Sequence, residues 1–273
     1  MKSIAKSLTI SFCFFLPAFV AAQQSSAPTQ PSDPSAGALL SKSLAALSGG
    51  NQITDVTLSG AARRIAGSDD ESGTAVVKSL AGTGTRLDLT LPSGTRTEIR
   101  NTSAALIAGS WSGPDGISRA AAYHNLLTDP GWAPAFTIAS LLSAQKAVVT
   151  YVGPETHDGQ SVIHVTASQQ FPDLAGDAKT ASLMQHLTQT DVYLDATTGL
   201  PGAITFNIHA DNNANLDIPV EIRFSDYRPV SGTQIPFHVQ KFINNSLAVD
   251  LQFISATVNS GLSSSIFAVG GAQ

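Results

Sequence analysis

The side chains with the widest chemical range in this chain are its six histidines, which are His124, His157, His164, His186, His209 and His238. None of them falls into an H-x-x-x-H or HExxH spacing, the patterns that place two imidazoles on one helix face. His157-Asp158 and His209 with Asp211 each set an imidazole beside a carboxylate, so either pair could contribute to a metal site. Such a site needs three or four convergent ligands, and both pairs lie in turn-like polar stretches. The sequence therefore favours solvated histidines and predicts no metal site.

Other catalytic patterns are also missing from the sequence. There is no G-x-S-x-G motif, and the serines that follow Gly261 lack the strand-to-helix context of a nucleophile elbow. Gly82-x-Gly84 precedes a predicted strand rather than a helix N-terminus, which removes the dinucleotide interpretation. A carboxylate pair for glycoside hydrolysis stays open, because any two acidic side chains could face each other across a cleft. We expect no cofactor and no enzymatic activity, with a hydrolase of unrecognised site as an alternative.

An apolar group in the middle of the chain is the best candidate for a functional surface. It consists of Trp111, Tyr123, Trp132, Phe136 and Leu141, in a segment with few charges. The simpler interpretation is that these residues are the core of helices packed on a sheet. In the functional interpretation they line a ligand cavity of the usual kind, mostly apolar with few polar anchors.

The N-terminal residues 1–22 have the pattern of a secretory signal. Lys2 and Lys6 precede an apolar run from Leu8 to Val20, and Ala21-Ala22 supplies small residues before a cleavage point. The run is too short for a membrane span. The single cysteine, Cys13, lies inside it, so the mature chain would contain no thiol. We therefore expect an exported protein, in the periplasm or outside the cell, with no transmembrane segment after cleavage.

Charge limits the classes of partner. Loss of Lys2 and Lys6 with the signal would change the formal net charge from −5 to −7. Nucleic acids and anionic membranes bind proteins through clustered Lys and Arg, so we expect neither as the main partner. About 250 residues would remain, enough for one sizeable core.

The elements that must position these side chains begin after a leader. Residues 23–35 are rich in Ser, Pro and Gln and are predicted to be disordered, and a single domain is expected over 36–273. Leu39, Leu40, Leu44 and Leu47 recur at helical spacing, and we expect Ser35 to cap this helix and Gly49-Gly50 to end it.

Two sets of strands are predicted on either side of a helical segment. The first set comprises Val56–Ile65, Thr74–Leu80, Thr85–Leu91, Arg96–Arg100 and Ala104–Trp111. Helices over 117–142 should then cover a face of the sheet. Strands Ala147–Val152 and Ser161–Ala167 follow, joined by a turn-rich stretch over 153–159, and then a helix over Ala175–Gln189 and a strand over Asp191–Asp195.

The clearest alternation of apolar and polar residues lies in Asp195–Asn259. Ile218, Val220, Ile222 and Phe224 should face one side of the sheet. The same alternation places together Ile235, Phe237 and Val239, and then Leu247, Val249, Leu251 and Phe253. This period of two fixes the strand register of a β-meander. Pro219 and Pro236 cannot donate to a ladder, so we expect them at strand ends, edges or bulges.

Two stretches of this meander carry a family resemblance. They are LDATTGLP at 194–201 and FSDYRPVSGTQIP at 224–236. A strand that ends in Asp, a Thr-Gly-Leu-Pro turn and an Asp-Tyr…Gly…Ile-Pro corner resemble the LolA/LolB-like superfamily of periplasmic lipoprotein carriers. The chain differs in being longer than a minimal carrier and in lacking an aromatic-rich leading segment, so the cargo does not transfer.

The resemblance implies an α+β fold. It is a strongly curved antiparallel β-sheet, an incomplete barrel, with a leading helix and with helices that cover the concave face around an apolar cavity. In that family the cavity receives acyl chains or a hydrophobic partner segment. We therefore expect a protein that binds a lipid, an acyl chain or a lipoprotein. The alternative is an envelope protein-interaction or sensing module whose core is filled and which has no small-molecule ligand.

Overall fold

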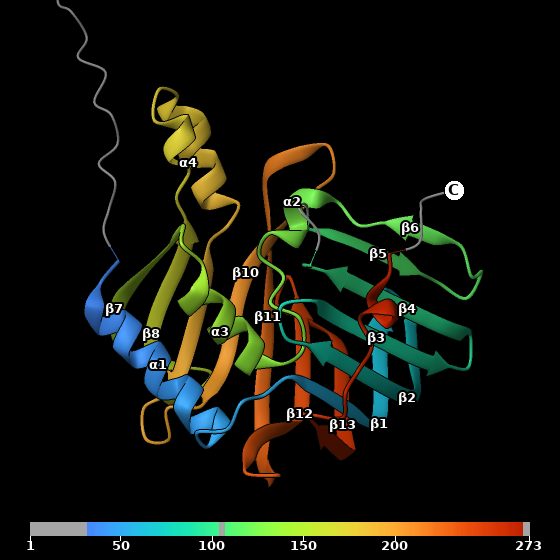
Figure 1. Ribbon diagram of the computed structural model, residues 1–273. Coiled ribbons are helices and arrows are strands. Elements are labelled where there is room, and N and C mark those ends of the chain that lie inside the picture. Colours follow the sequence, from blue (N-terminus) through green and yellow to red (C-terminus); the bar gives the residue numbers. More distant parts are fainter. Residues whose placement is uncertain (1–31, 104–106, 270–273) are drawn as a thin grey trace, which may run out of the picture.

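A computed structural model of the chain describes residues 32–103 and 107–269 (Figure 1). The predicted signal at 1–22 and most of the predicted leader lie outside these residues. The described strands form one 13-stranded antiparallel sheet in the order β6-β5-β4-β3-β2-β1-β13-β12-β11-β10-β9-β8-β7. The sheet is curved and stays open, and α1 and α3 lie across its concave side. This confirms the predicted fold class.

The sheet consists of two meanders joined at one ladder. The first contains β1 (Asp55–Ala66), β2 (Asp69–Leu80), β3 (Gly84–Leu91), β4 (Gly94–Asn101), β5 (Ala108–Ser112) and β6 (Ser118–Ala120). The second contains β7 (Ala147–His157), β8 (Gln160–Gln169), β9 (Thr190–Asp195), β10 (Pro201–Ala210), β11 (Asn213–Val230), β12 (Thr233–Ile243) and β13 (Ser246–Val258). Pairing of β1 with β13, from Val56 opposite Val258 to Arg64 opposite Val249, connects the two.

The leading helix α1 spans Pro34–Ser48, so it begins two residues before the expected domain boundary at 36. Its N-cap is Asp33, whose carboxylate accepts hydrogen bonds from Ser35 N (2.8 Å) and Ser35 Oγ (2.7 Å). The prediction of Ser35 as the cap was wrong, because Pro34 suits the first helical position and moves the cap two residues earlier, to Asp33. Gly49 ends the helix as predicted, with a φ of 60° that favours glycine.

The other helices are α2 (Tyr123–Leu126), α3 (Pro134–Ser143) and α4 (Ala178–His186), with short 3₁₀ turns η1 (Pro172–Leu174) and η2 (Ser264–Phe267). The helical prediction that began at Ile117 was wrong at its start. Gly116 (φ 71°) turns the chain so that Ser118–Ala120 pairs with the exposed edge of β5 as strand β6. Helix α4 begins three residues later than the predicted 175, because Asp177 caps it at Thr180 N.

Strand β7 is longer than predicted, since the stretch over 153–159 is mostly strand. A register shift between Tyr151 and Gly153 absorbs the irregularity, and only Asp158 (φ 48°) and Gly159 (φ 76°) form the hairpin turn. Pro219 and Pro236 lie inside strands, but each lies outside the paired residues of one of the two ladders that its strand forms. Pro219 precedes the β11–β12 pairing, which starts at Val220, and Pro236 lies past the end of the β12–β13 pairing at His238.

The core fills the centre of the concave face. Leu40 and Leu47 of α1 and Ile138 of α3 are completely buried against the sheet. On the sheet side, Ile222, Phe224, Val239, Leu251 and Phe253 are buried as the alternation predicted. Within the described ranges, no helix is both long and apolar enough to cross a bilayer.

Candidate functional site: a cavity beside helix α3

A cavity of about 430 Å³ lies between α3 and the sheet. Its walls come from the β2–β3 turn, the end of β4, the segment between α2 and α3, α3 itself, and the adjoining ends of β7, β8 and β9. The large apolar side chains in these walls are Leu80, Ile107, Leu127, Trp132, Phe136 and Leu141. The cavity is therefore a hollow at one end of the core rather than a gap through its centre.

The segment before α3 is fixed by local hydrogen bonds. Asp129 Oδ1 accepts from Gly131 N (2.8 Å), and the φ of 69° at Gly131 forms a tight turn. Pro134 occupies the first turn of α3, where its missing N–H costs nothing. Thr137 Oγ1 donates back to Pro130 O (2.7 Å). These contacts determine where Trp132 and Phe136 enter the cavity wall.

Trp132 is held by the sheet as well as by the helix. It is only 4% exposed, and Lys241 Nζ of β12 lies 5.4 Å from its ring centroid. Burial disfavours the charged form of Lys241, but Glu98 and Asp129 outweigh this and raise the pKa of the lysine. A protonated lysine against the indole face gives a cation–π contact that fixes this wall.

One cation and one carboxylate reach the cavity. Arg100 of β4 donates to Leu126 O from Nε (3.2 Å) and Nη2 (3.0 Å). Burial lowers the pKa of Arg100, and the negative charge of Asp129 opposes that shift. Both side chains line the cavity, so the site combines apolar walls with a few polar groups, the usual composition of a small-molecule site.

The structure brings together three of the five residues predicted as cavity lining, namely Trp132, Phe136 and Leu141. Trp111 lies on β5 and is 46% exposed, and the guanidinium carbon of Arg119 lies 4.9 Å from its ring centroid. Tyr123 begins α2 and is 49% exposed. Neither is among the residues that form this cavity. The ligand-binding role of all five stays a prediction.

A second cavity, of about 590 Å³, lies at the opposite ends of β8 and β9. Ala46 of α1, Leu200, Phe224 and Tyr227 contribute to its walls. Between the two cavities the space beneath α1 and α3 is packed, with a void of only about 10 Å³ beside Trp132. The concave face is thus filled in the middle and hollow at both ends.

The Asp-Tyr corner has a structural role. Tyr227 donates its hydroxyl hydrogen to Pro201 O (2.8 Å), and burial raises the pKa of this hydroxyl well above 10. Asp226, with a φ of 53°, pairs with Arg228 at 2.6 Å. The corner therefore fastens β11 to the start of β10.

Several histidines are paired with carboxylates rather than simply solvated, which corrects the sequence prediction. On the outer face of the sheet, Nε2 of His157 lies 2.8 Å from Glu221 and Nε2 of His164 lies 2.8 Å from Asp191. Tyr193 stacks on both imidazoles, at 3.9 Å and 4.5 Å between ring centroids. As far as the described residues show, none of these five lines either cavity.

The chain matches no protein-family model and no curated protein. Solved structures share its fold, and three of them are described here. An outer membrane lipoprotein-sorting protein domain from Vibrio parahaemolyticus has a TM-score of 0.53 at 12% identity, over 85% of this chain and 96% of the other. A DUF1329 family protein from Desulfovibrio piger has a TM-score of 0.54 at 10% identity, over 89% and 100%. A LolA superfamily protein from Nitrosomonas europaea has a TM-score of 0.50 at 11% identity, over 85% and 97%.

The chain therefore has the LolA-type fold. At 10–12% identity the likeness concerns the fold alone. It confirms the fold that the sequence resemblance implies.

Proposed function

We propose that this chain binds a hydrophobic ligand, such as an acyl chain of a lipid or lipoprotein, in the cavity beside α3, and that it does so without catalysis. The observation that carries the proposal is the cavity itself. Its volume of about 430 Å³ falls within the roughly 300–1,000 Å³ of small-molecule sites. Its walls contain large apolar side chains on the concave side of the sheet.

Three further points support the proposal. A structure with the same fold is described as an outer membrane lipoprotein-sorting domain. The export expected from residues 1–22 would bring the chain into the periplasm, where a lipidated partner would meet it. Arg100 at the cavity wall offers a cation to the polar headgroup of a lipid. Trp132, Phe136 and Leu141 offer apolar surface to its acyl chain.

Uptake of a fluorescent fatty acid by the purified protein tests the proposal. Ala139→Trp places an indole in the cavity wall, and Ala61→Trp places the same group on an exposed position of β1. Steric blocking of the cavity should cost on the order of 1–3 kcal/mol of binding free energy, so the Ala139→Trp variant should bind roughly 5–150-fold more weakly. The Ala61→Trp variant should bind like the wild type.

Equal binding by the Ala139→Trp variant would show that the ligand lies elsewhere, and the cavity at Leu200 and Phe224 would be the next candidate. Absence of uptake by the wild type would contradict the proposal. It would instead favour the protein-interaction module, for which the packed centre beneath α1 and α3 is already sufficient.

A further inference from the structure

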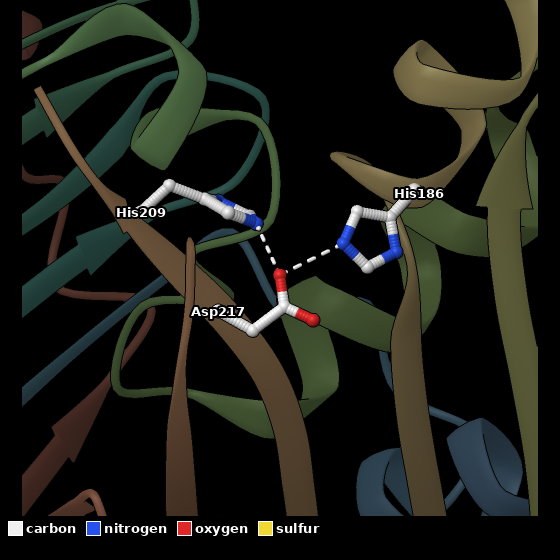
Figure 2. Close-up of side chains that lie close together, drawn as sticks. All are labelled: His186, His209 and Asp217. Carbon is white, nitrogen blue, oxygen red and sulfur yellow. Dashed lines mark hydrogen bonds and ion pairs between the residues drawn. The ribbon is translucent and has the colours of Figure 1, made fainter. Parts of the chain in front are cut away.

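Three potential metal ligands converge at the base of α4 (Figure 2). They are His186, His209 and Asp217, and their ligand atoms all lie within 4.8 Å of one another. Nε2 of His186 lies 2.8 Å from Asp217 Oδ1, and Nε2 of His209 lies 3.0 Å from the same oxygen. Both imidazoles thus point their Nε2 atoms at one carboxylate oxygen.

Three separate elements supply these groups. His209 and Asp217 stand opposite each other in the β10–β11 ladder, and His186 is the last residue of α4. The sequence prediction paired His209 with Asp211, but the hairpin register places Asp217 beside it instead. The position of His209 is fixed by Asn125, whose side chain accepts from His209 N (2.7 Å) and donates to His209 O (3.0 Å).

His209 is an unusual histidine because its side chain is only 1% exposed. Its Nδ1 atom is buried and has no hydrogen-bond partner among the described residues. The rings of His124 and His186 approach it edge-on, at 6.1 Å and 5.7 Å between centroids. Burial of a polar ring with only one hydrogen bond is unfavourable. A metal ion would bind at the other ring nitrogen, Nε2, in place of its bond to Asp217.

We propose that His186, His209 and Asp217 form a binding site for a divalent transition-metal ion, with Zn²⁺ as the best-fitting ion. Two imidazole nitrogens and one carboxylate oxygen are a ligand set that zinc uses, with a water in the fourth position. In a tetrahedral zinc site, bonds of roughly 2.0–2.1 Å put ligand atoms about 3.4 Å apart. The observed separations of 2.8 Å and 3.0 Å need to open by only a few tenths of an ångström.

The site has a structural consequence for α4. All residues of this helix are described, and none of them is buried; the helix projects from the edge of the sheet (Figure 1). His186 lies where α4 meets the buried residues Leu187 and Thr188. A metal ion on His186 would fasten the base of α4 to the β10–β11 hairpin and so slow its local opening.

Isothermal titration of the purified chain, made without a polyhistidine tag, with Zn²⁺ tests this site. We expect one Zn²⁺ per chain and no detectable binding of Mg²⁺, which prefers oxygen ligands. His186→Ala removes a ligand whose side chain is 40% exposed, so the fold should persist. Loss of a group that only hydrogen-bonds to a ligand costs about 10–100-fold in affinity, so loss of a ligand should cost at least as much.

The matched control is His238→Ala, because His238 forms a simple pair with Asp250 (2.8 Å) away from the group. It should leave zinc binding unchanged. Hydrogen exchange supplies the second measurement. At a Zn²⁺ concentration of about 100 times the dissociation constant, amides of α4 should exchange up to about 100-fold more slowly in the wild type, but not in the His186→Ala variant.

Absence of zinc binding, equal affinity for Mg²⁺, or zinc binding that survives both His186→Ala and Asp217→Asn would overturn the proposal. In that case the group is only a hydrogen-bonded cluster. The test is independent of the lipid cavity, since zinc titration requires no hydrophobic ligand.

Discussion

At the residue scale, strand β13 shows how strictly the two faces of the sheet differ. Leu251 is completely buried, whereas Ile254, three residues along, is 83% exposed. We predict that Leu251→Asp unfolds the domain, because a buried unpaired charge costs several kcal/mol against a total stability of about 5–15 kcal/mol. Phe224→Asp should behave in the same way. Thermal unfolding followed by circular dichroism measures the effect.

The matched control is Ile254→Asp, which adds the same charge to the exposed face. It should unfold within a few degrees of the wild type, since such surface substitutions usually change stability by less than about 0.5 kcal/mol. A wild-type melting temperature for Leu251→Asp would contradict the assignment of faces.

Asp55 makes the stability depend on pH. Burial disfavours its ionised form, but hydrogen bonds from Ser260 Oγ (2.7 Å), Ser260 N (2.8 Å) and Gly261 N (2.9 Å) outweigh burial and lower the pKa of Asp55 below 3.8. A carboxyl whose pKa is lowered by folding stabilises the fold above its unfolded pKa, and this stabilisation is lost as the pH falls through the folded pKa.

Asp55→Asn should therefore lower the melting temperature at pH 5–7. The difference from the wild type should shrink as the pH falls below about 4, where the wild-type carboxyl becomes protonated. Unfolding curves between pH 2 and pH 7 measure this. A difference that stays constant over the whole range would show that the charge of Asp55 does not fasten the segment after β13.

At the element scale, α1 stops where its end meets the β11–β12 turn. Gly49 has a φ of 60°, and a Cβ there would collide with the carbonyl oxygen of Gly232. Gly50 has a φ of 82°, and a Cβ there would meet no atom within 4 Å. Alanine would be strained by the left-handed backbone at both positions. Comparing the two alanine variants therefore isolates the effect of the close approach of Gly49 to Gly232.

We predict that Gly50→Ala costs about 1–2 kcal/mol from the left-handed conformation alone. Gly49→Ala should cost roughly 1–3 kcal/mol more, the usual price of overpacking. Urea unfolding of both variants measures the difference. Equal destabilisation would mean that the backbone around Gly232 yields freely, and that this contact does not position α1.

The elements that the sequence predicted well are those whose patterns are local. Period-two alternation found the strands around Val220, Val239 and Leu251, and Gly49 marked the helix end. Strand β6 was missed because its three residues are held only by pairing with β5. At the end of β7 the sequence predicts a turn because Gly153 and Pro154 break local patterns, while pairing with β8 keeps both residues in the ladder.

In the whole molecule, contacts between segments far apart in the sequence determine where the strands and helices lie. Nothing in the sequence orders β1 beside β13, yet that ladder joins the two meanders into one sheet. Trp132 and Phe136 could be recognised as an apolar pair, but only the α3 placement separates them from Trp111 and Tyr123. The cluster of His186, His209 and Asp217 needs both a hairpin register and the position of α4.

Native mass spectrometry of the purified mature protein tests whether the cavity beside α3 holds a hydrophobic ligand. We predict a population whose mass exceeds that of the chain by that of a lipid or acyl ligand, which organic extraction removes and which the Ala139→Trp variant lacks. A bare chain mass, together with no uptake of fluorescent fatty acid, would contradict the account.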